Sequence, residues 1–174
     1  KEIDCTSPQN VYGKSKELGE YFLLNSDRKY TIIRTTIVGL NLNKNKVGFV
    51  EWIIKSAKKD ESITLFEDVK FTPISIWDLG NEIFFLIKNS YISSEILNIS
   101  GKSICTKYEF GKKLLDSLNI SRDAIKKGLI TSFKDRAKRC KDQTLDNTYY
   151  EKKYSRKLPN FDKTILNIKN HYNG

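Results

Sequence analysis

A tyrosine and a lysine four residues apart are the first candidates for chemistry in this sequence. Tyr12 and Lys16 lie in the stretch SPQNVYGKSKELGEYF, residues 7–22, which predicts a helix. Side chains at i and i+4 share one face of a helix, so the lysine can reach the tyrosine. A phenol has a pKa of about 10 and exchanges protons poorly at neutral pH, but a nearby ammonium stabilises the phenolate. The two residues could therefore form an acid–base pair, or they could be ordinary residues of a lysine-rich helix.

The same spacing occurs twice more, so spacing alone does not decide between these interpretations. Tyr108 and Lys112 form one such pair, and Tyr149 and Lys153 form the other. Each falls in a predicted amphipathic helix, where an aromatic ring packs inward and a lysine faces water. We expect both of these pairs to be structural. The first pair differs because Gly13 directly follows its tyrosine and leaves room beside the hydroxyl.

Predicted helices and strands alternate along the chain. Apolar spacing and capping residues predict helices over residues 11–25, 48–59, 78–89, 107–118 and 145–154, and a last one from about residue 162. β-branched and apolar runs predict strands over residues 29–39, 62–66 and 95–101, with one more strand among turns in residues 121–143. Residues 71–76 are predicted to be extended, because Pro73 disfavours helix for the residue before it. We expect Asp146 to be the N-cap of its helix. This alternation predicts an α/β fold with parallel strand pairing.

Composition narrows the class of protein. The chain has 174 residues, 39% hydrophobic and 30% charged, which is typical of a soluble globular protein. The sequence contains no apolar run of about eighteen residues, the length that a membrane span requires, so we expect no membrane partner. Three widely spaced cysteines suggest neither a disulfide framework nor a zinc site and fit a cytoplasmic location. His171, the single histidine, is expected to be a solvated surface residue, so no metal site is predicted.

The net charge of +10 favours anionic partners. Only SFKDRAKRCK, residues 132–141, concentrates this charge locally, and no stacking-aromatic motif accompanies it. We therefore expect no nucleic-acid partner, whereas a small ligand carrying a diphosphate would use the same positive field. The chain also contains no methionine, which predicts that it is a piece of a longer protein whose upstream part precedes residue 1.

Several segments, in order along the chain, resemble one enzyme family. The segment SPQNVYGKSKELGE resembles the active-site helix of extended short-chain dehydrogenase/reductases. The segments that follow are similar, more narrowly, to the dTDP-4-dehydrorhamnose reductase family, and they are YTIIRTTIVG, GFVEWIIKSAKK, FTPISIWDLGNEI, ILNISG, TKYEFGKKLL and AKRCKDQTLDNTYYEK. The resemblance covers nearly the whole chain.

The resemblance implies the C-terminal part of a Rossmann-like doubly wound parallel sheet plus a small α/β substrate-binding domain. Residues 1–40 would end the NAD(P)-binding domain, and residues 41–174 would form the substrate-binding region. Whether some of the later segments return to the Rossmann-like sheet is left open. The phosphate-binding glycine fingerprint of the family would lie in the missing N-terminal part.

The resemblance also implies an activity. The whole enzyme would reduce dTDP-4-dehydro-6-deoxy-L-mannose to dTDP-L-rhamnose, or a related deoxysugar, with NADPH or NADH, for cell-surface polysaccharide synthesis. Tyr12 would protonate the developing alkoxide, and Lys16 would bind the nicotinamide ribose, so both residues are expected to be catalytic and cofactor-binding. The residues expected at the nucleotide-diphosphate sugar are Thr36, Ile37, Phe49, Thr72 and Arg139. The chain alone is expected to be inactive, and a homodimer is left open.

Departures from the family pattern leave other functions open. Ile37, Val38 and Gly39 stand where the family often has Trp-Val-Tyr, and Gly48 replaces the usual asparagine. One alternative is another extended short-chain dehydrogenase/reductase, such as a nucleotide-sugar epimerase or dehydratase. A second is a non-catalytic NADP-binding subunit that acts through a partner, as the regulatory subunit of methionine adenosyltransferase does.

Overall fold

A computed structural model describes residues 1–43, 45–133 and 137–172 of the chain. Residues 134–136 of the basic stretch lie outside the described residues. The helices are α1 Val11–Leu24, α2 Phe49–Lys58, α3 Ile76–Lys88, α4 Lys107–Ser117, α5 Thr148–Tyr154 and α6 Phe161–Asn170, with a 3-10 turn η1 at Ile130–Ser132. The strands are β1 Thr31–Arg34, β2 Ile37–Val38, β3 Ile63–Phe66, β4 Lys70–Phe71, β5 Ile74–Ser75, β6 Glu95–Asn98, β7 Cys105–Thr106, β8 Ile125–Gly128 and β9 Asp142–Gln143.

Parallel pairing dominates the described strands. β1 pairs with β6, β2 with β5, β3 with β8 and β4 with β9, all in parallel. Only β4 and β7 pair antiparallel among these strands. Each parallel partner lies far along the chain, with a helix between the two strands in every case. The predicted α/β fold with parallel pairing is confirmed.

Thr106 and Ser75 are the N-caps of two helices that the sequence predicts, over residues 107–118 and 78–89. The Thr106 hydroxyl accepts a hydrogen bond from the Glu109 amide at 3.1 Å, and the Glu109 carboxylate accepts one from the Thr106 amide at 2.7 Å. This reciprocal pair satisfies two amides at the start of α4. The Ser75 hydroxyl likewise accepts from the Asp78 amide at 3.1 Å at the start of α3.

Three local predictions were wrong. The single strand predicted over residues 29–39 is two strands, because the chain changes partner from β6 to β5 after Arg34. Residues 121–143 contain two strands, β8 and β9, and not one. Asp146 is not the N-cap of α5, since Asn147 occupies that position, although the Asp146 carboxylate accepts from the Thr148 amide at 2.9 Å.

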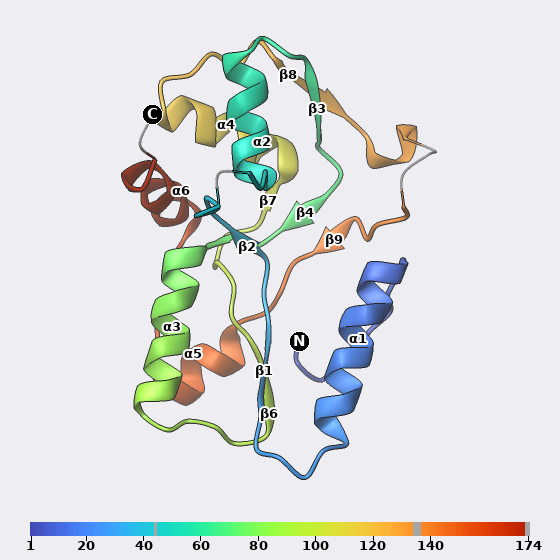
Figure 1. The fold of residues 1–174 in the computed structure, drawn as a ribbon, viewed down its shortest axis with the longest axis vertical. Helices are drawn as coiled ribbons and strands as arrows, with labels where there is room; N and C mark the ends of the chain where they lie inside the picture. Colours follow the sequence, from blue (N-terminus) through green and yellow to red (C-terminus); the bar gives the residue numbers. More distant parts are fainter. Residues whose placement is uncertain (44, 134–136, 173–174) are drawn as a thin grey trace.

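Two hydrophobic cores lie at opposite ends of the molecule (Figure 1). The first, drawn in the upper half, packs α2, α4 and α6 against β3, β4 and β7, with Phe71 and Phe110 fully buried at its centre. The second packs α3 and α5 against β5 and β6, around Ile74, Leu97 and Tyr150.

The helix α1 belongs to neither core. It has no buried residue, and it stands on the side of β1 and β6 opposite to α3 and α5 (Figure 1). Its apolar side chains face solvent, including Val11, Leu18 and Phe22 at 83%, 52% and 64% exposure. None of the helices in the described part of the chain is long and apolar enough to cross a membrane.

Candidate functional site

The Tyr12–Lys16 pair lies at the solvent-exposed start of α1. The Lys16 ammonium is 5.3 Å from the centroid of the Tyr12 ring, so the two side chains share one face as their spacing predicts. Tyr12 is 72% exposed and Lys16 is also exposed. In the described part of the chain no side chain hydrogen-bonds the phenol and no carboxylate pairs with the ammonium. Both polar groups are therefore available to a ligand.

Local contacts fix the start of this helix. The Asn10 side chain is its N-cap and accepts a hydrogen bond from the Gly13 amide at 2.9 Å. A Cβ on Gly13 would lie 3.0 Å from the Cβ of Pro8, which is closer than side-chain carbons normally pack. The glycine thus lets the chain turn tightly from the proline into the helix that carries Tyr12.

A bidentate ion pair attaches the middle of α1 to the sheet. Arg34 on β1 donates from Nε to Glu20 Oε1 at 3.0 Å and from Nη2 to Glu20 Oε2 at 2.6 Å. Both side chains are less than a fifth exposed, and the hydrogen bond to Glu20 outweighs burial in raising the pKa of Arg34. A bidentate pair of this kind fixes the relative orientation of the two side chains as well as the distance between them. Glu20 and Arg34 therefore fix α1 relative to β1 without a buried apolar face.

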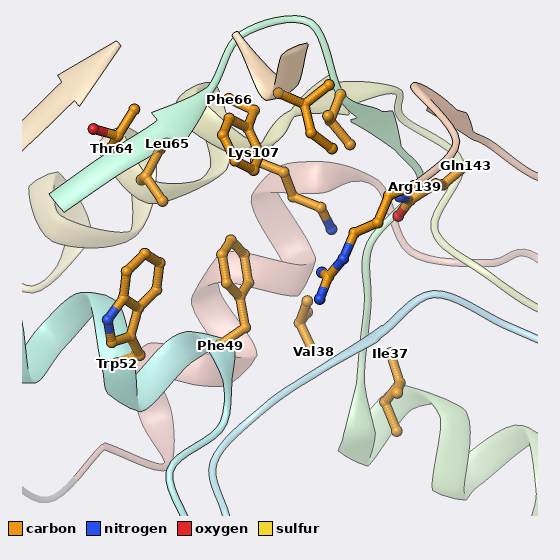
Figure 2. Close-up of a pocket in the computed structure, with 12 residues that line it drawn as sticks. Ile37, Val38, Phe49, Trp52, Thr64, Leu65, Phe66, Lys107, Arg139 and Gln143 are labelled. Carbon is orange, nitrogen blue, oxygen red and sulfur yellow. The ribbon is translucent and has the colours of Figure 1, made fainter. Parts of the chain in front are cut away.

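A pocket of about 450 Å³ lies between α2, β3 and the segment that precedes β9. Ile37, Phe49 and Arg139, three of the five predicted substrate residues, line it. Figure 2 shows the Arg139 guanidinium pointing into the space beside Phe49 and Val38. Three residues predicted from distant segments thus meet in one cavity.

Thr36 and Thr72 do not line this pocket. Thr72 is 2% exposed, and its hydroxyl accepts hydrogen bonds from the Ser100 hydroxyl at 2.9 Å and the Leu145 amide at 3.2 Å. The Thr36 hydroxyl donates to the Thr72 carbonyl. In this structure both threonines connect strands to one another, and their contact with a substrate stays a prediction.

Arg139 links the pocket to the Tyr12 helix. The Asn10 side-chain amide donates to the carbonyl of Lys138, the residue before Arg139, at 2.8 Å. A second hollow, of about 480 Å³, is lined by Gln9 just before α1 and by Arg139 from the other side. The exposed pair and the pocket are therefore joined through one short segment of chain.

Lys107 is a pocket residue that the sequence analysis did not identify. Its ammonium points toward the same space as the Arg139 guanidinium (Figure 2). Burial, which outweighs the opposing effect of Cys105 and is aided by the charge of Arg139, lowers the pKa of Lys107 to about 8. The available signal was a lysine in the first turn of a helix, where the helix dipole disfavours positive charge. Trp52 and Phe66 also line the pocket. The sequence could not identify them as pocket residues, because an aromatic residue at either position would fit an ordinary hydrophobic core equally well.

The other two Tyr/Lys pairs have different surroundings. The Tyr149 hydroxyl and the Lys153 ammonium both donate to one oxygen of Glu95, at 3.1 and 2.6 Å. Tyr108 is half-buried and Lys112 is exposed on α4, with no contact between the two side chains among the described interactions. These observations agree with the structural roles expected for both pairs.

The single histidine and the three cysteines are the remaining candidates for metal binding or reactivity. His171 is exposed, as expected, but its ring also stacks on Trp77 with centroids 3.8 Å apart. Cys5, Cys105 and Cys140 are free thiols, and burial raises the pKa of Cys105 to about 12. Within residues 1–43, 45–133 and 137–172, no group of three or more His, Cys, Asp or Glu side chains could hold a metal ion.

A family model described as the RmlD substrate binding domain matches residues 1–173. The chain belongs to this family. The predicted membership of the dTDP-4-dehydrorhamnose reductase family is thereby confirmed.

Two curated relatives match over different spans. The chain is 30% identical over 116 residues to the spore coat polysaccharide biosynthesis protein SpsK of Bacillus subtilis, covering 67% of this chain and 39% of that protein. It is 23% identical over 175 residues to the dTDP-4-dehydrorhamnose reductase of Sinorhizobium fredii, covering 96% of this chain and 58% of that protein. The chain thus spans less than two thirds of the length of each relative.

A solved structure shares the fold. The crystal structure of dTDP-4-dehydrorhamnose reductase from Bacillus anthracis in complex with NADP matches with a TM-score of 0.87 at 24% identity. The match covers 98% of this chain and 59% of that one. The RmlD family fold therefore extends over the described elements, including the separate helix α1.

Proposed function

We propose that the protein containing this chain reduces the 4-keto group of a dTDP-linked 6-deoxyhexose with NADPH or NADH. The single observation that carries this proposal is the Tyr12–Lys16 pair, exposed on one face of α1 with both polar groups free of protein partners among the described residues. Family membership and the sugar-nucleotide enzymes among the relatives support the substrate class.

The residues present fit a nicotinamide cofactor. The Lys16 ammonium is exposed, and no carboxylate in the described part of the chain uses its donors, so it can hydrogen-bond the hydroxyls of a ribose. The bound cofactor supplies the hydride that reduces the ketone carbon. Residues 1–40 would provide the last part of the cofactor-binding domain and residues 41–174 the substrate region, with the glycine-rich phosphate site contributed by the upstream part.

The proton required by this reduction comes from Tyr12. As the carbonyl oxygen gains negative charge, the Tyr12 hydroxyl donates its proton to that oxygen and becomes a phenolate. The Lys16 ammonium, on the same helix face, stabilises this phenolate electrostatically. The alcohol product then carries one hydrogen from the cofactor and one from Tyr12, and solvent returns a proton to the phenolate.

The pocket beyond Arg139 would hold the nucleotide part of the substrate. Arg139 supplies a guanidinium suited to phosphate oxygens, and Phe49 and Ile37 supply apolar surface. Ile37 provides no aromatic contact to the sugar, so this side of the pocket would discriminate weakly among 6-deoxy-4-ketohexoses.

The test is a steady-state assay of the full-length protein with NADPH and dTDP-4-dehydro-6-deoxy-L-mannose. We expect oxidation of NADPH in step with formation of a dTDP-deoxysugar heavier by two hydrogens. Matched reactions with dTDP-glucose separate the rival activity, because a dehydratase would form a 4-keto sugar without net loss of NADPH. Absence of NADPH oxidation with every dTDP-4-keto sugar offered would remove the reductase proposal.

A further inference from the structure

Lys107 brings a second positive charge into the pocket. It is the first residue of α4, and its ammonium lies 3.3 Å from the centroid of the Phe71 ring and 5.1 Å from that of Phe49. Aromatic faces attract a cation while leaving its hydrogen-bond donors unused. The side chain is therefore held in place by rings, and its N–H groups point into the open space that Arg139 also faces (Figure 2).

The charge of Lys107 has no compensating carboxylate among the residues that the structure describes. Neither Lys107 nor Arg139 forms an ion pair with a carboxylate in the described part of the chain. Lys107 also lies at the N-terminus of α4, which carries partial positive charge, and beside the like charge of Arg139. The nearest carboxylate on its own helix, Glu109, is taken up by the capping box with Thr106.

Lys107 is half-buried and Arg139 lines the same pocket, so these two like charges, which have no carboxylate partner among the described residues, repel each other. An anion bound between them would relieve the mutual repulsion and the burial of charge, and it would also lie near the positive end of α4. The required ligand has more than one negative oxygen, because it must face both cations from one position. A diphosphate has this chemistry, and the apolar wall of Phe49 and Trp52 leaves room for the rest of a nucleotide.

We propose that Lys107 binds the diphosphate of the nucleotide sugar together with Arg139, as a specificity residue for nucleoside diphosphates. The substrate class in this inference rests on the proposed function. Binding of the diphosphate by Lys107 does not require that the protein catalyse the reduction. Among the described residues, the groups that act electrostatically on Lys107 are Arg139 and the thiol of Cys105 on β7. This thiol stays neutral in the working range because burial raises its pKa. The charge of the pocket is therefore set by Lys107 and Arg139.

The experiment is calorimetric binding of dTDP and of thymidine to the full-length protein without cofactor. Lys107→Met keeps the length and apolar contacts of the side chain but removes its charge, and we expect it to weaken dTDP binding by about tenfold to a hundredfold. Thymidine, which lacks the diphosphate, should bind the variant as it binds the wild type. Lys112→Met, an exposed lysine on the same helix, is the matched control and should leave dTDP affinity unchanged.

A second variant separates charge from folding. Lys107→Arg should retain most of the dTDP affinity, since it keeps a cation at the same place, and both variants should unfold thermally close to the wild type. Binding of dTDP to Lys107→Met within about twofold of the wild type, or an equal loss for thymidine, would overturn the proposal. A protein that binds dTDP through Lys107 but oxidises no NADPH would overturn the reductase function and leave this site standing.

Discussion

The helices α1 and α5 carry the same Tyr-x-x-x-Lys spacing in opposite surroundings. On α5, the Tyr149 hydroxyl and the Lys153 ammonium are both hydrogen-bonded to Glu95. On α1, Tyr12 and Lys16 share a face with each other, with no carboxylate pairing with the ammonium in the described part of the chain. The same residue pair thus stabilises the fold where an acid neutralises it and is available for proton transfer where none does.

The pKa values of Glu95 and Lys153 show that hydrogen bonds hold both groups firmly in their charged forms. Burial raises the pKa of Glu95, but hydrogen bonds from Lys153, Ser93, Tyr154 and Tyr149 outweigh it and lower that pKa to about 2. The hydrogen bond to Glu95 in turn raises the pKa of Lys153. A lysine so strongly paired cannot also stabilise a phenolate, which makes Tyr149–Lys153 a useful internal control.

The largest expected effect is on turnover when Tyr12 loses its hydroxyl. Tyr12→Phe should lower kcat about 10²- to 10⁴-fold, because it removes the hydroxyl that we propose donates the proton to the carbonyl oxygen. Binding of dTDP should survive, since the phenol is outside the pocket that Arg139 lines. Steady-state kinetics and calorimetry on the full-length protein measure the two quantities.

The matched variant on α5 should behave in the opposite way. Tyr149→Phe removes one of the donors to Glu95 and should cost about 1 kcal/mol of unfolding free energy with kcat unchanged. Equal losses of turnover in both variants, or unchanged turnover in Tyr12→Phe, would contradict a catalytic role for Tyr12 and a structural role for Tyr149.

A smaller effect is expected on acid stability through Glu95. Its folded pKa is depressed from 4.5 to about 2, so its contribution is fully present above about pH 4.5 and is lost as the pH falls toward 2. The shift corresponds to about 3 kcal/mol at most, and we expect about 2 kcal/mol because Lys153 is partly exposed. Urea unfolding of Glu95→Gln against the wild type should therefore show this difference near pH 6 and little of it near pH 2.

Glu61→Gln is the control for the acid experiment, since in the described part of the chain that carboxylate makes only an exposed pair with Lys59 at 3.6 Å. It should change the unfolding free energy by less than about 1 kcal/mol. A Glu95→Gln difference that is the same at both pH values would show that the carboxylate is not held in its charged form by the cluster.

Most of the fold could be predicted because its signals are local. The helix capped by Thr106 and Glu109 follows from a four-residue pattern, and the strand at Glu95–Asn98 follows from an apolar run. The strand β9, Asp142–Gln143, could not be predicted, because two polar residues carry no alternation and their pairing with β4 is set by tertiary contacts. The break between β1 and β2 was missed for a related reason, since only the change of partner marks it.

The candidate site likewise has one part that local sequence predicts and one part that only the tertiary structure shows. Tyr12 and Lys16 are four residues apart, so helix geometry alone predicts that they meet. The pocket joins residues from α2, β3, α4 and the segment before β9, and no sequence spacing relates them. Ile37, Phe49 and Arg139 were placed by family resemblance, whereas Lys107 required the structure, because its significance depends on the Arg139 beside it and on the absence of a counter-ion in the described residues.

The most direct test of the central claim is a double-mutant cycle in kcat on Tyr12→Phe, Lys16→Met and the double variant, at saturating NADPH and dTDP-4-keto sugar. If the two residues act as one catalytic unit, the double variant should be no more than about tenfold slower than the worse single variant. A double variant whose loss equals the product of the two single losses would show that Tyr12 and Lys16 act independently and would contradict the account.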